Sequence, residues 1–397
     1  MPRLKVLFIT TWYPTKENPV SGIFVREHAK AVRLYDDVVV LHLMGEDPKL
    51  KGFWRIEREV DETFTENIPT FRVWSRHFPI IKARYFYGIL KSFPYIISKG
   101  FRPDIIHSHI YVTGISSVLV GKLYRIPVVI TEHSTEFPRK LLRSRDVWKS
   151  RFAFNRANMV FPVSNSLQRA MEEYGIEARF QVIPNVVDTN LFYPDSSDRL
   201  KSPTKRLLTV ALLDSSHKKG IPLLLNALAY LTSKRDDWRL NILGDGPART
   251  EYQRLTVDLG LANKVTFHGL KSKPEVAEFM RQSDLLVVPS LFETFSVVTA
   301  EALAAGIPVL ATNCGGPEEF VTNDVGLLVP PGSVDALVGG LDYMLNHLER
   351  FKPDETSCYA AEHFSYAGVG EQLHENYLEC ITKYKGLHGT ATKAGTS

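Results

Sequence analysis

The chain of 397 residues has little cysteine: Cys314, Cys358 and Cys380 are its only thiols, and none belongs to a Cys-x-x-Cys pair. Three widely spaced cysteines exclude an even disulfide framework and favour reduced thiols in a cytoplasmic protein. Cys314 stands in a glycine-rich turn, where a nucleophilic role is a minor alternative. The cysteines therefore point away from a secreted, disulfide-stabilised domain.

Long apolar runs are also lacking. No uninterrupted apolar stretch reaches the ~18 residues that a membrane span needs. The run Lys5–Thr11 is too short for a secretory signal and predicts a first strand instead. With 44% hydrophobic and 23% charged residues, the composition is that of an ordinary globular protein of two domains.

Two cofactor signatures are missing. Without a Gly-x-Gly-x-x-Gly motif, a nicotinamide or flavin enzyme finds no support. Without an Asp-x-Asp motif, a metal ion that would hold a diphosphate is not indicated either. We therefore expect a protein with no cofactor and no metal.

Positive charge is concentrated in the first half. Residues 1–200 hold 29 Lys and Arg against 21 Asp and Glu, and the remainder holds 19 against 23. Residues 67–103 contain seven bases and no acid, with aromatic residues interleaved, and a second basic run spans Arg139–Arg151. An anionic membrane surface, an anionic acceptor or a nucleic acid would fit this pattern. The alternative is that the basic residues lie on solvated helix faces and bind no partner, while the aromatic residues belong to the core.

Strand-like runs alternate with helix-like segments along the whole chain, which predicts parallel sheets covered by helices. Amphipathic segments such as Ile23–Leu34 and Gly114–Tyr124 lie between the strands. The expected strands are Lys5–Thr11, Val38–Leu43, Asp104–His107, Val128–Glu132, Met159–Val163 and Phe180–Ile183 in a first series, and Leu207–Leu212, Trp238–Leu243, Lys264–His268, Asp284–Val288, Pro308–Ala311 and Leu327–Val329 in a second.

The polar stretch Asp195–Lys205 separates these two series and reads as a linker. We expect an α/β protein with doubly wound domains over 1–195 and 196–367. A helix over 368–385 is expected to pack back on the first domain, followed by a disordered tail over 386–397. Two such domains usually bind a ligand in the cleft between them, at the carboxyl ends of their strands.

The most informative feature is a pair of glutamates eight positions apart, Glu293 and Glu301. The buried strand before them ends at Pro289, Ser296 is a plausible N-cap, and a helix follows as far as Gly306. The first amides of such a helix attract phosphate. Carboxylates on either side suit the hydroxyls of sugars attached to that phosphate better than the phosphate itself. Two solvated acids on an ordinary strand–loop–helix are the alternative.

Other polar residues and glycines stand at the remaining strand ends. Gly22 precedes a helix, where backbone can approach a phosphate. His109 and His133 follow two strands of the first series and are candidates for functional roles. In the second series the corresponding positions are Lys218, Lys219, Gly244 and Gly269.

Taken in order, these segments resemble the retaining glycosyltransferases of family 4, which have the GT-B fold of two Rossmann-like domains facing each other across a cleft. The similarity covers nearly the whole chain and is strongest between Leu207 and Pro331. The motifs that match the family there are, in order, Lys-Gly, Gly-Asp-Gly-Pro, Val-Thr-Phe-His-Gly, Pro-Ser-Leu-Phe-Glu, Glu-Ala-Leu-Ala and Gly-Gly-Pro-Glu.

The resemblance implies a role for each candidate. Glu293 would hold hydroxyls of the donor sugar, Glu301 the ribose, and Lys219 the diphosphate. His109 would line the place where donor and acceptor meet. The residues assigned to donor binding are Gly22, Lys218, Lys219, Gly244, Gly269, Glu293, Phe295, Ser296, Val297 and Glu301, those assigned to catalysis are Glu293, His109 and Lys219, and those assigned to the acceptor are His133, Arg72 and Arg76.

Three departures from the family pattern stand out. The family usually carries an arginine shortly before the lysine, where this chain has Ala211-Leu212-Leu213. Lys218, His217 or a distant arginine would have to supply that charge. Thr294 and Ser296 replace common glycines, and a valine replaces the usual glycine in Asn185-Val-Val-Asp188.

The expected function is retaining, metal-independent transfer of a hexosyl group from a nucleotide diphosphate sugar to a hydroxyl of a glycan or lipid-linked acceptor. We expect a cytoplasmic enzyme, peripheral on the inner face of the plasma membrane, that acts in the synthesis of cell-surface polysaccharide or glycolipid. One alternative is a sugar-nucleotide epimerase or phosphorylase of the same fold. The other is a non-enzymatic binder of anions or nucleic acid.

Overall fold

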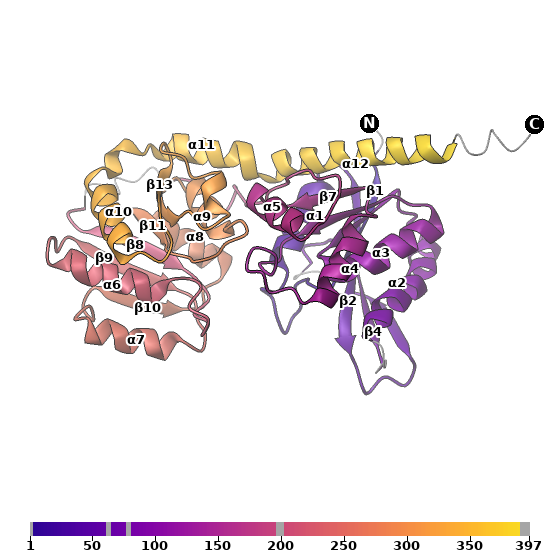
Figure 1. The fold of residues 1–397 in the computed structure, drawn as a ribbon, viewed down its shortest axis with the longest axis horizontal. Helices are drawn as coiled ribbons and strands as arrows, with labels where there is room; N and C mark the ends of the chain where they lie inside the picture. Colours follow the sequence, from indigo (N-terminus) through magenta and orange to yellow (C-terminus); the bar gives the residue numbers. More distant parts are fainter. Residues whose placement is uncertain (1–2, 61–64, 77–80, 196–201, 390–397) are drawn as a thin grey trace, which may run out of the picture. The chain divides into compact units, whose positions relative to one another are not determined.

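The computed structural model describes residues 3–60, 65–76, 81–195 and 202–389, and the chain forms two compact units (Figure 1). The first unit comprises Met1–Val186 together with Tyr366–Ser397, and the second comprises Val187–Ser365. The sequence places the boundary later, at 195/196. The segment before it belongs to the second unit, where the Val187 N–H donates to the Phe364 carbonyl (2.8 Å).

The first unit is built on a seven-stranded sheet of order β3-β4-β2-β1-β5-β6-β7. All neighbours are parallel except β3 and β4, which pair antiparallel at one edge. The central strands are buried over nearly their whole length, as expected for a parallel sheet covered on both faces. The bounds are β1 Lys5–Thr10, β2 Asp37–Glu46, β3 Trp54–Arg58, β4 Thr70–Ser75, β5 Ile105–His109, β6 Val128–Glu132 and β7 Met159–Pro162.

Helices cover this sheet, and the last one comes from the far end of the chain. Helix α12, Tyr366–Gly389, packs against α1 and contributes Val369, Leu373 and Tyr377 to the core of the first unit (Figure 1). Gly370 lies so close to α1 that an added Cβ would sit 2.3 Å from the Ala31 carbonyl oxygen. The other helices are α1 Ile23–Arg33, α2 Ile81–Ser98, α3 Tyr111–Tyr124, α4 Ser144–Phe154 and α5 Asn165–Glu173.

The second unit has a six-stranded, wholly parallel sheet of order β10-β9-β8-β11-β12-β13. Its strands are short and apolar, and its core gathers around the fully buried Trp238 and the leucines of α6. The bounds are β8 Lys205–Val210, β9 Trp238–Leu243, β10 Val265–Gly269, β11 Leu285–Val288, β12 Val309–Thr312 and β13 Gly326–Val329.

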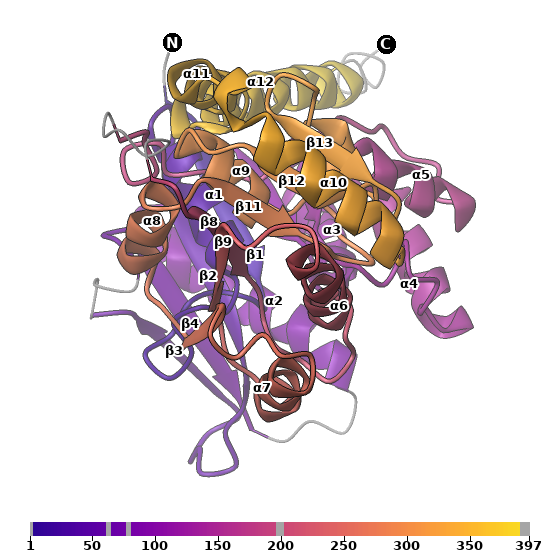
Figure 2. The same cartoon turned by 90° about the vertical axis from the view of Figure 1, so that its left-hand side faces the viewer.

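Helices flank both faces of the second sheet, and α6 packs against both α7 and α10 (Figure 2). The helices are α6 Ile221–Thr232, α7 Arg249–Asp258, α8 Lys273–Arg281, α9 Val297–Ala304, α10 Val334–Asn346 and α11 Pro353–Phe364, with 3₁₀ turns η2 Pro317–Glu319 and η3 Leu348–Arg350. In the described residues, no helix is long and apolar enough to cross a bilayer.

The predicted strands agree with the observed ones except for β3, β4 and Phe180–Ile183. Strands β3 and β4 were not predicted. Strand β3 is a partly exposed edge strand in which arginine and glutamate alternate with other residues, and β4 lies in the acid-free stretch 67–103, which was interpreted as a basic surface. The predicted strand Phe180–Ile183 is wrong, since Phe180 forms only an isolated bridge with Val160. The predicted disordered tail begins at 386, yet 386–389 continue α12, and 390–397 lie outside the described residues.

Both sheets reverse their strand order at one point, between β1 and β5 in the first unit and between β8 and β11 in the second. The loops after two such neighbouring strands diverge to opposite faces of the sheet and leave a crevice, where ligands of doubly wound sheets bind. Gly22 follows β1 and His109 ends β5, whereas Lys219 follows β8 and Glu293 follows β11. The strongest candidates therefore stand at the two switch points.

Candidate active site

The loop before α9 is held rigidly by the loop after β12. Glu293 forms an isolated parallel bridge with Gly315: its N–H donates to the Cys314 carbonyl (3.3 Å), and its own carbonyl accepts from the Gly316 N–H (2.9 Å). Gly316 is in such close contact that an added Cβ would lie 2.4 Å from the Cα of Phe295. The backbone that carries Glu293 is thus attached to the sheet like an additional short strand.

The Glu293 carboxylate meets a cation from the other side of the switch point. Its Oε1 accepts from Lys219 Nζ at 2.7 Å and from Ser290 Oγ at 2.7 Å. The side chains are 10% exposed for Glu293 and 25% exposed for Lys219, so both remain open to a ligand. Residues 74 positions apart in the chain are therefore brought into one charged pair.

Gly220 explains why Lys219 can reach that position. It is the N-cap of α6 with φ 68°, and an added Cβ would stand 1.8 Å from the Pro289 carbonyl oxygen. Beside it, the Leu291 N–H donates to the Lys218 carbonyl (2.7 Å). Only glycine allows the loop after β8 to lie directly on the loop after β11.

Ser296 begins α9 as predicted, but it does so in an unexpected conformation. Its φ of 75° and ψ of 75° are left-handed, and its hydroxyl bonds the Thr299 hydroxyl (2.8 Å) rather than capping an amide. A non-glycine residue held there costs about 1–3 kcal/mol. The following amides, at Val297 and Val298, belong to the first turn, whose N–H groups have no acceptor within the helix. They are suited to an anion.

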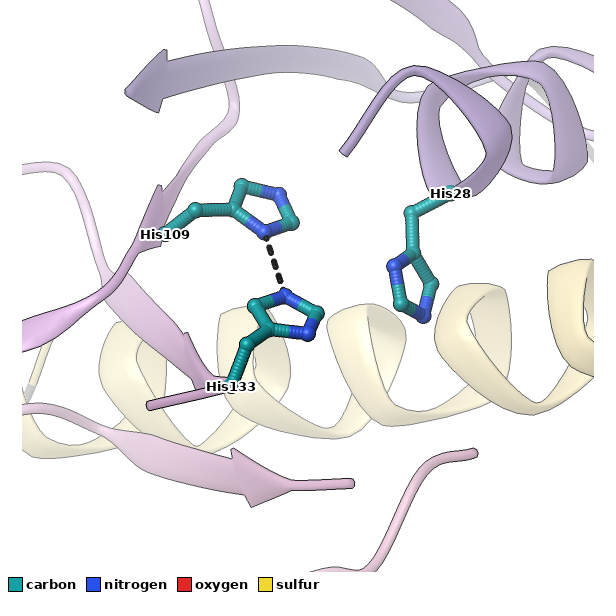
Figure 3. Close-up of side chains that lie close together, drawn as sticks. All are labelled: His28, His109 and His133. Atoms are coloured by element: carbon teal, nitrogen blue, oxygen red, sulfur yellow. Dashed lines mark hydrogen bonds between the residues drawn. The ribbon is translucent and has the colours of Figure 1, made fainter. Parts of the chain in front are cut away.

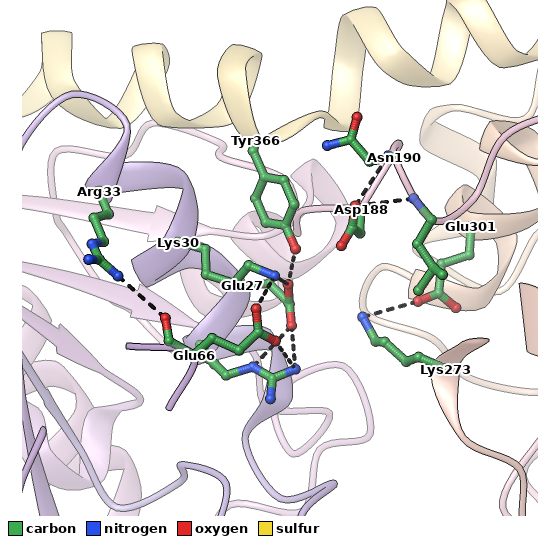
Figure 4. A network of polar contacts seen from close by, with 11 residues as sticks. Glu27, Lys30, Arg33, Glu66, Asp188, Asn190, Lys273, Glu301 and Tyr366 are labelled. Carbon is green, nitrogen blue, oxygen red and sulfur yellow. Dashed lines mark hydrogen bonds and ion pairs between the residues drawn. The ribbon is translucent and has the colours of Figure 1, made fainter. Parts of the chain in front are cut away.

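Glu301 is the fifth residue of α9 and is also near a cation. Lys273 Nζ, from the start of α8, stands 3.5 Å from Glu301 Oε1, with the glutamate side chain 10% exposed (Figure 4). The second acid of the sequence pattern is thus balanced by a lysine, just as the first one is. Both carboxylates are held in place and partly accessible.

The other predicted donor residues surround the same sheet edge. Gly244, with φ 125°, has no room for a Cβ, which would lie 1.8 Å from the Ala211 carbonyl oxygen, and its N–H donates to the Gly269 carbonyl (2.8 Å). Lys218 Nζ lies 3.5 Å from Asp214. His217 contacts the Tyr252 hydroxyl at 3.0 Å, and both Lys218 and His217 remain candidates for the charge of the missing arginine.

In the first unit, Gly22 caps α1 in a left-handed conformation with φ 62°. A Cβ there would lie 2.2 Å from the carbonyl carbon of Trp12, so the loop after β1 passes directly under the start of the helix. Since α1 begins with Ile23, its first amides face the same way as Gly22. The observed backbone suits the phosphate contact that the sequence suggests.

His109 ends β5, His133 directly follows the neighbouring strand β6, and the two side chains touch each other, as Figure 3 shows. His109 Nδ1 lies 3.3 Å from His133 Nε2, and the two rings are stacked 12° from parallel. His107 stacks on His109 with centroids 4.4 Å apart, and His28 from α1 completes the cluster. Burial and the neighbouring histidines hold the pKa values of His109 and His133 well below the usual range. These imidazoles are neutral at physiological pH.

Nitrogen atoms of His28, His109 and His133 lie within 4.8 Å of one another, close enough to share a metal ion. Burial lowers the pKa of His28 to about 4, so its ring carries one N–H at neutral pH. Its two nitrogens each lie 3.1 Å from a backbone carbonyl, of Phe24 and of Pro184. A metal would have to displace one of these contacts, and we assign none.

The backbone after His109 is strained. Ile110 has φ 63° and ψ 148°, a combination that is nearly confined to glycine and that costs about 1–3 kcal/mol for another residue. The Ile110 N–H donates to the Thr131 carbonyl (2.8 Å), and Thr113 Oγ1 donates to the His109 carbonyl (2.7 Å). Such strain persists only where surrounding contacts enforce it, and it is common at functional sites.

Arg72 corrects the acceptor assignment. It is 3% exposed on β4, and its guanidinium contacts Glu59 (2.7 Å), His42 (2.5 Å) and the Pro14 carbonyl (2.8 Å). With its donors used inside the first unit, it supports the loop after β1 and is not available to an acceptor. Arg76 is exposed at the end of β4 and remains a candidate.

The nucleophilic alternative for Cys314 also loses support. Burial raises the pKa of its thiol to about 11, so the thiolate that nucleophilic attack needs is scarce at neutral pH. The Cys314 carbonyl instead accepts the Glu293 N–H. We interpret this residue as part of the loop that supports the glutamate.

Sequence reasoning missed four residues that shape these sites: His28, Glu132, Lys273 and Ser290. Glu132 carried a signal, because it is a charged residue that ends the apolar strand Val128–Glu132. Ser290 follows Pro289 at a strand end, where polar residues often contact ligands. His28 and Lys273 sit on helices and offered no local signal.

A further missed network fixes α1 to α12 within the first unit. The Glu27 carboxylate accepts from the Tyr366 hydroxyl and from Arg26 (2.8 Å), while Lys30 pairs with Glu66 (2.6 Å) (Figure 4). Because Glu27 is almost fully buried, its charge requires these partners. The helix that Gly22 begins is thereby held against the last helix of the chain.

Comparison with known proteins places the chain in a family. Residues 24–191 match Glycosyltransferase Family 4, and residues 192–355 match Glycosyl transferases group 1. A D-inositol 3-phosphate glycosyltransferase of Paenarthrobacter aurescens is 31% identical over 306 residues, which cover 71% of this chain and 74% of that protein. An uncharacterized glycosyltransferase of Methanocaldococcus jannaschii is 30% identical, covering 61% of this chain and 66% of that protein.

Solved structures agree on the fold. Sucrose-phosphate synthase from Thermosynechococcus elongatus superposes with a TM-score of 0.73 at 19% identity, covering 96% of this chain and all of that one. HepE of Anabaena in complex with UDP-glucose gives 0.73 at 21% identity, covering 95% of this chain and all of that one. With two Rossmann-like units and these relatives, the chain is a glycosyltransferase of family 4 with the GT-B fold.

Proposed function

We propose that this glycosyltransferase moves a sugar from a nucleoside diphosphate sugar to an acceptor hydroxyl, with retention of the anomeric configuration. The observation that carries the proposal is the position of Glu293. Its carboxylate is fixed between Lys219 and Ser290 at the switch point of the second sheet, directly before the start of α9. A sugar diphosphate bound there would meet an acid, a cation and helix amides together.

In this proposal the second unit binds the donor. Glu293 accepts hydrogen bonds from hydroxyls of the donor sugar, and Glu301 accepts them from the ribose. Lys219 and Lys218, with the amides of Phe295, Ser296 and Val297, contact the diphosphate. Gly244 and Gly269 form the tight turns beside the nucleotide.

The chemical step follows from electrostatics. The departing diphosphate gains negative charge, which Lys219 and the positive end of the α9 dipole stabilise without a metal ion. Glu293 serves as a hydrogen-bond acceptor for distal hydroxyls and not as the covalent nucleophile of a retaining hydrolase. The proton of the acceptor hydroxyl passes to the leaving diphosphate.

The first unit supplies the remaining groups. We keep Gly22 as a phosphate contact, His109 as the residue at the reacting sugar, and His133 and Arg76 as acceptor contacts. A neutral His109 can donate from one ring nitrogen and accept at the other, which suits a sugar hydroxyl. Its ring already uses Nδ1 towards His133, so Nε2 is the atom that would face the sugar.

For the acceptor we propose a hydroxyl of a glycan or lipid-linked intermediate of cell-surface polysaccharide or glycolipid. The relatives named D-inositol 3-phosphate glycosyltransferases favour a second candidate, a phosphorylated cyclitol. Transfer assays with both acceptor classes separate the two. Formation of an epimerised sugar nucleotide or a sugar 1-phosphate instead of a glycoside would favour the epimerase or phosphorylase alternative.

The donor proposal is tested by thermal-shift measurements against UDP-, GDP- and ADP-sugars. We expect one nucleotide class to raise the unfolding temperature by several degrees, because saturation at about 100 Kd adds roughly 2.7 kcal/mol. Glu301→Gln should reduce that shift if its carboxylate holds the ribose. A salt-dependent response to oligonucleotides with none to sugar nucleotides would contradict the proposal and favour a nucleic-acid binder.

We also propose that the enzyme is cytoplasmic and docks on an anionic membrane through α4. Trp148 is 64% exposed and contacts Phe152 (ring centroids 5.6 Å apart), and the Arg156 guanidinium lies 4.1 Å from the Phe152 ring centroid. Arg143 and Arg145 are exposed just before and at the start of this helix. Aromatic and basic side chains together suit the interface of an anionic bilayer.

A vesicle sedimentation assay checks this. We expect the protein to pellet with phosphatidylglycerol vesicles and the Arg143→Glu/Arg145→Glu variant to bind at least about tenfold more weakly, since each base near the surface contributes about 1 kcal/mol. Lys234→Glu, an exposed reversal in the second unit, is the matched control and should bind normally. Equal binding to neutral and anionic vesicles would contradict electrostatic docking.

A further inference from the structure

One buried carboxylate contacts the backbone at both histidine-bearing strand ends. Glu132, the last residue of β6, has no exposed surface. Its Oε2 accepts from the Tyr111 N–H (2.9 Å), and its Oε1 accepts from the N–H groups of His133 (2.9 Å) and Ser134 (2.8 Å). The same side chain therefore holds the residue two positions after His109 and the backbone of His133 itself.

The Tyr111 contact secures a strained junction. Ile110, between His109 and Tyr111, has the positive φ of 63° described above, and relaxation of this residue would swing the end of β5. Its own N–H is held by Thr131 on β6 (2.8 Å), next to Glu132 in sequence. Strand β6 thus restrains the backbone on both sides of Ile110, through the Thr131 carbonyl and the Glu132 side chain.

The ring contact depends on that backbone. His109 Nδ1 and His133 Nε2 are 3.3 Å apart and their planes differ by 12°, a geometry that a small displacement of either strand end would break. Glu132 has both oxygens occupied by backbone N–H groups, so it is placed to hold these rings and not to react.

We propose that Glu132 is a positioning residue that holds His109 and His133 in the orientation needed for sugar transfer. The inference rests on the proposed function in one respect, the role of His109 at the reacting sugar. It assigns Glu132 no contact with substrate and no proton transfer. The carboxylate acts through three backbone hydrogen bonds.

Glu132→Gln separates this role from simple filling of space. The single amide oxygen of glutamine can accept from both His133 and Ser134, but its NH₂ group then faces the Tyr111 N–H, and two donors cannot bond. The variant keeps its volume and loses the restraint on the strained junction. Asp36→Asn is the matched control, because Asp36 is a fully buried carboxylate that accepts the Leu4 N–H (3.0 Å) at the opposite edge of the same sheet.

We expect Glu132→Gln to lower kcat by about tenfold to a hundredfold and to leave the KM for the sugar nucleotide within about twofold. In a His109→Ala background the same substitution should lower kcat by clearly less than it does in the wild type, because one of the two residues that it positions is gone. Asp36→Asn should lower the unfolding temperature without this change in kcat. A normal kcat in Glu132→Gln, or a full additional loss on top of His109→Ala, would overturn the inference.

A readout independent of activity distinguishes this inference from the proposed function. In protein labelled with ¹⁵N-histidine, Glu132→Gln should shift the ring nitrogen resonances of His109 and His133, and Asp36→Asn should not. Unchanged resonances would overturn the positioning role. If Glu132→Gln shifts these resonances but the wild-type protein transfers no sugar, the result would support the positioning role and reject the proposed function.

Discussion

Lys219→Ala and Glu293→Ala are each expected to lower the rate of sugar transfer at least about a hundredfold while the protein stays folded. In the proposed function Lys219 stabilises the diphosphate as it gains charge, and Glu293 accepts hydrogen bonds from the sugar that the diphosphate carries. The pair is in contact at 2.7 Å, so the double variant should lose less than the sum of the two single losses.

The measurement is single-turnover transfer with radiolabelled sugar nucleotide, with the unfolding temperature recorded for each variant. Lys234→Ala and Asp258→Ala are the controls, because both residues are exposed in the second unit and stand at the ends of α6 and α7, away from the switch point. They should keep near-normal rates. Near-normal rates in Lys219→Ala and Glu293→Ala as well would remove both residues from the site.

Gly220→Ala is expected to destabilise the second unit by about 3 kcal/mol or more and to abolish donor binding. Two costs add up: about 1–2 kcal/mol for alanine at φ 68° and about 1–3 kcal/mol for the clash with Pro289. The Cβ would lie 1.8 Å from the Pro289 carbonyl oxygen. The loop must move away, and Lys219 moves with it.

Gly260→Ala is a closely matched control, since its φ is 71° but nothing lies within 4 Å of the added Cβ. This substitution should lower the free energy of unfolding by about 1–2 kcal/mol, the cost of alanine in a left-handed conformation, and should leave donor binding intact. Hydrogen exchange of the β8 amides reports the stability of the second unit. Equal destabilisation by the two substitutions would show that Gly220 is not packed against Pro289.

The alternation of strands and helices could be predicted from the sequence because the parallel strands are buried on both faces. Runs such as Leu285–Val288 are apolar throughout and end at proline or glycine. Strand β3, Trp54–Arg58, lies at an edge and is partly exposed, so its alternation of arginine and glutamate carries no such signal. Strand β4 was missed because it lies in the acid-free stretch 67–103, which the sequence presents as a basic surface.

The candidate site could be located for the same reason, since strand ends of a parallel sheet meet at one edge. The partners of each side chain could not be predicted. Arg72 looks like a surface base in the sequence, yet pairing across β3 and β4 buries it beside Glu59. Lys219 and Glu293 are 74 positions apart, and only the strand order β8–β11 brings them together.

Helix α12 gives the chain an order of assembly. The second unit is one continuous segment from Val187 to Ser365, whereas the first unit completes its core with residues of α12. A ribosome therefore releases every residue of the second unit before it releases the helix that completes the core of the first unit. During synthesis the first unit therefore lacks the core residues of α12, while the second unit, inserted between its two parts, is already complete and able to fold.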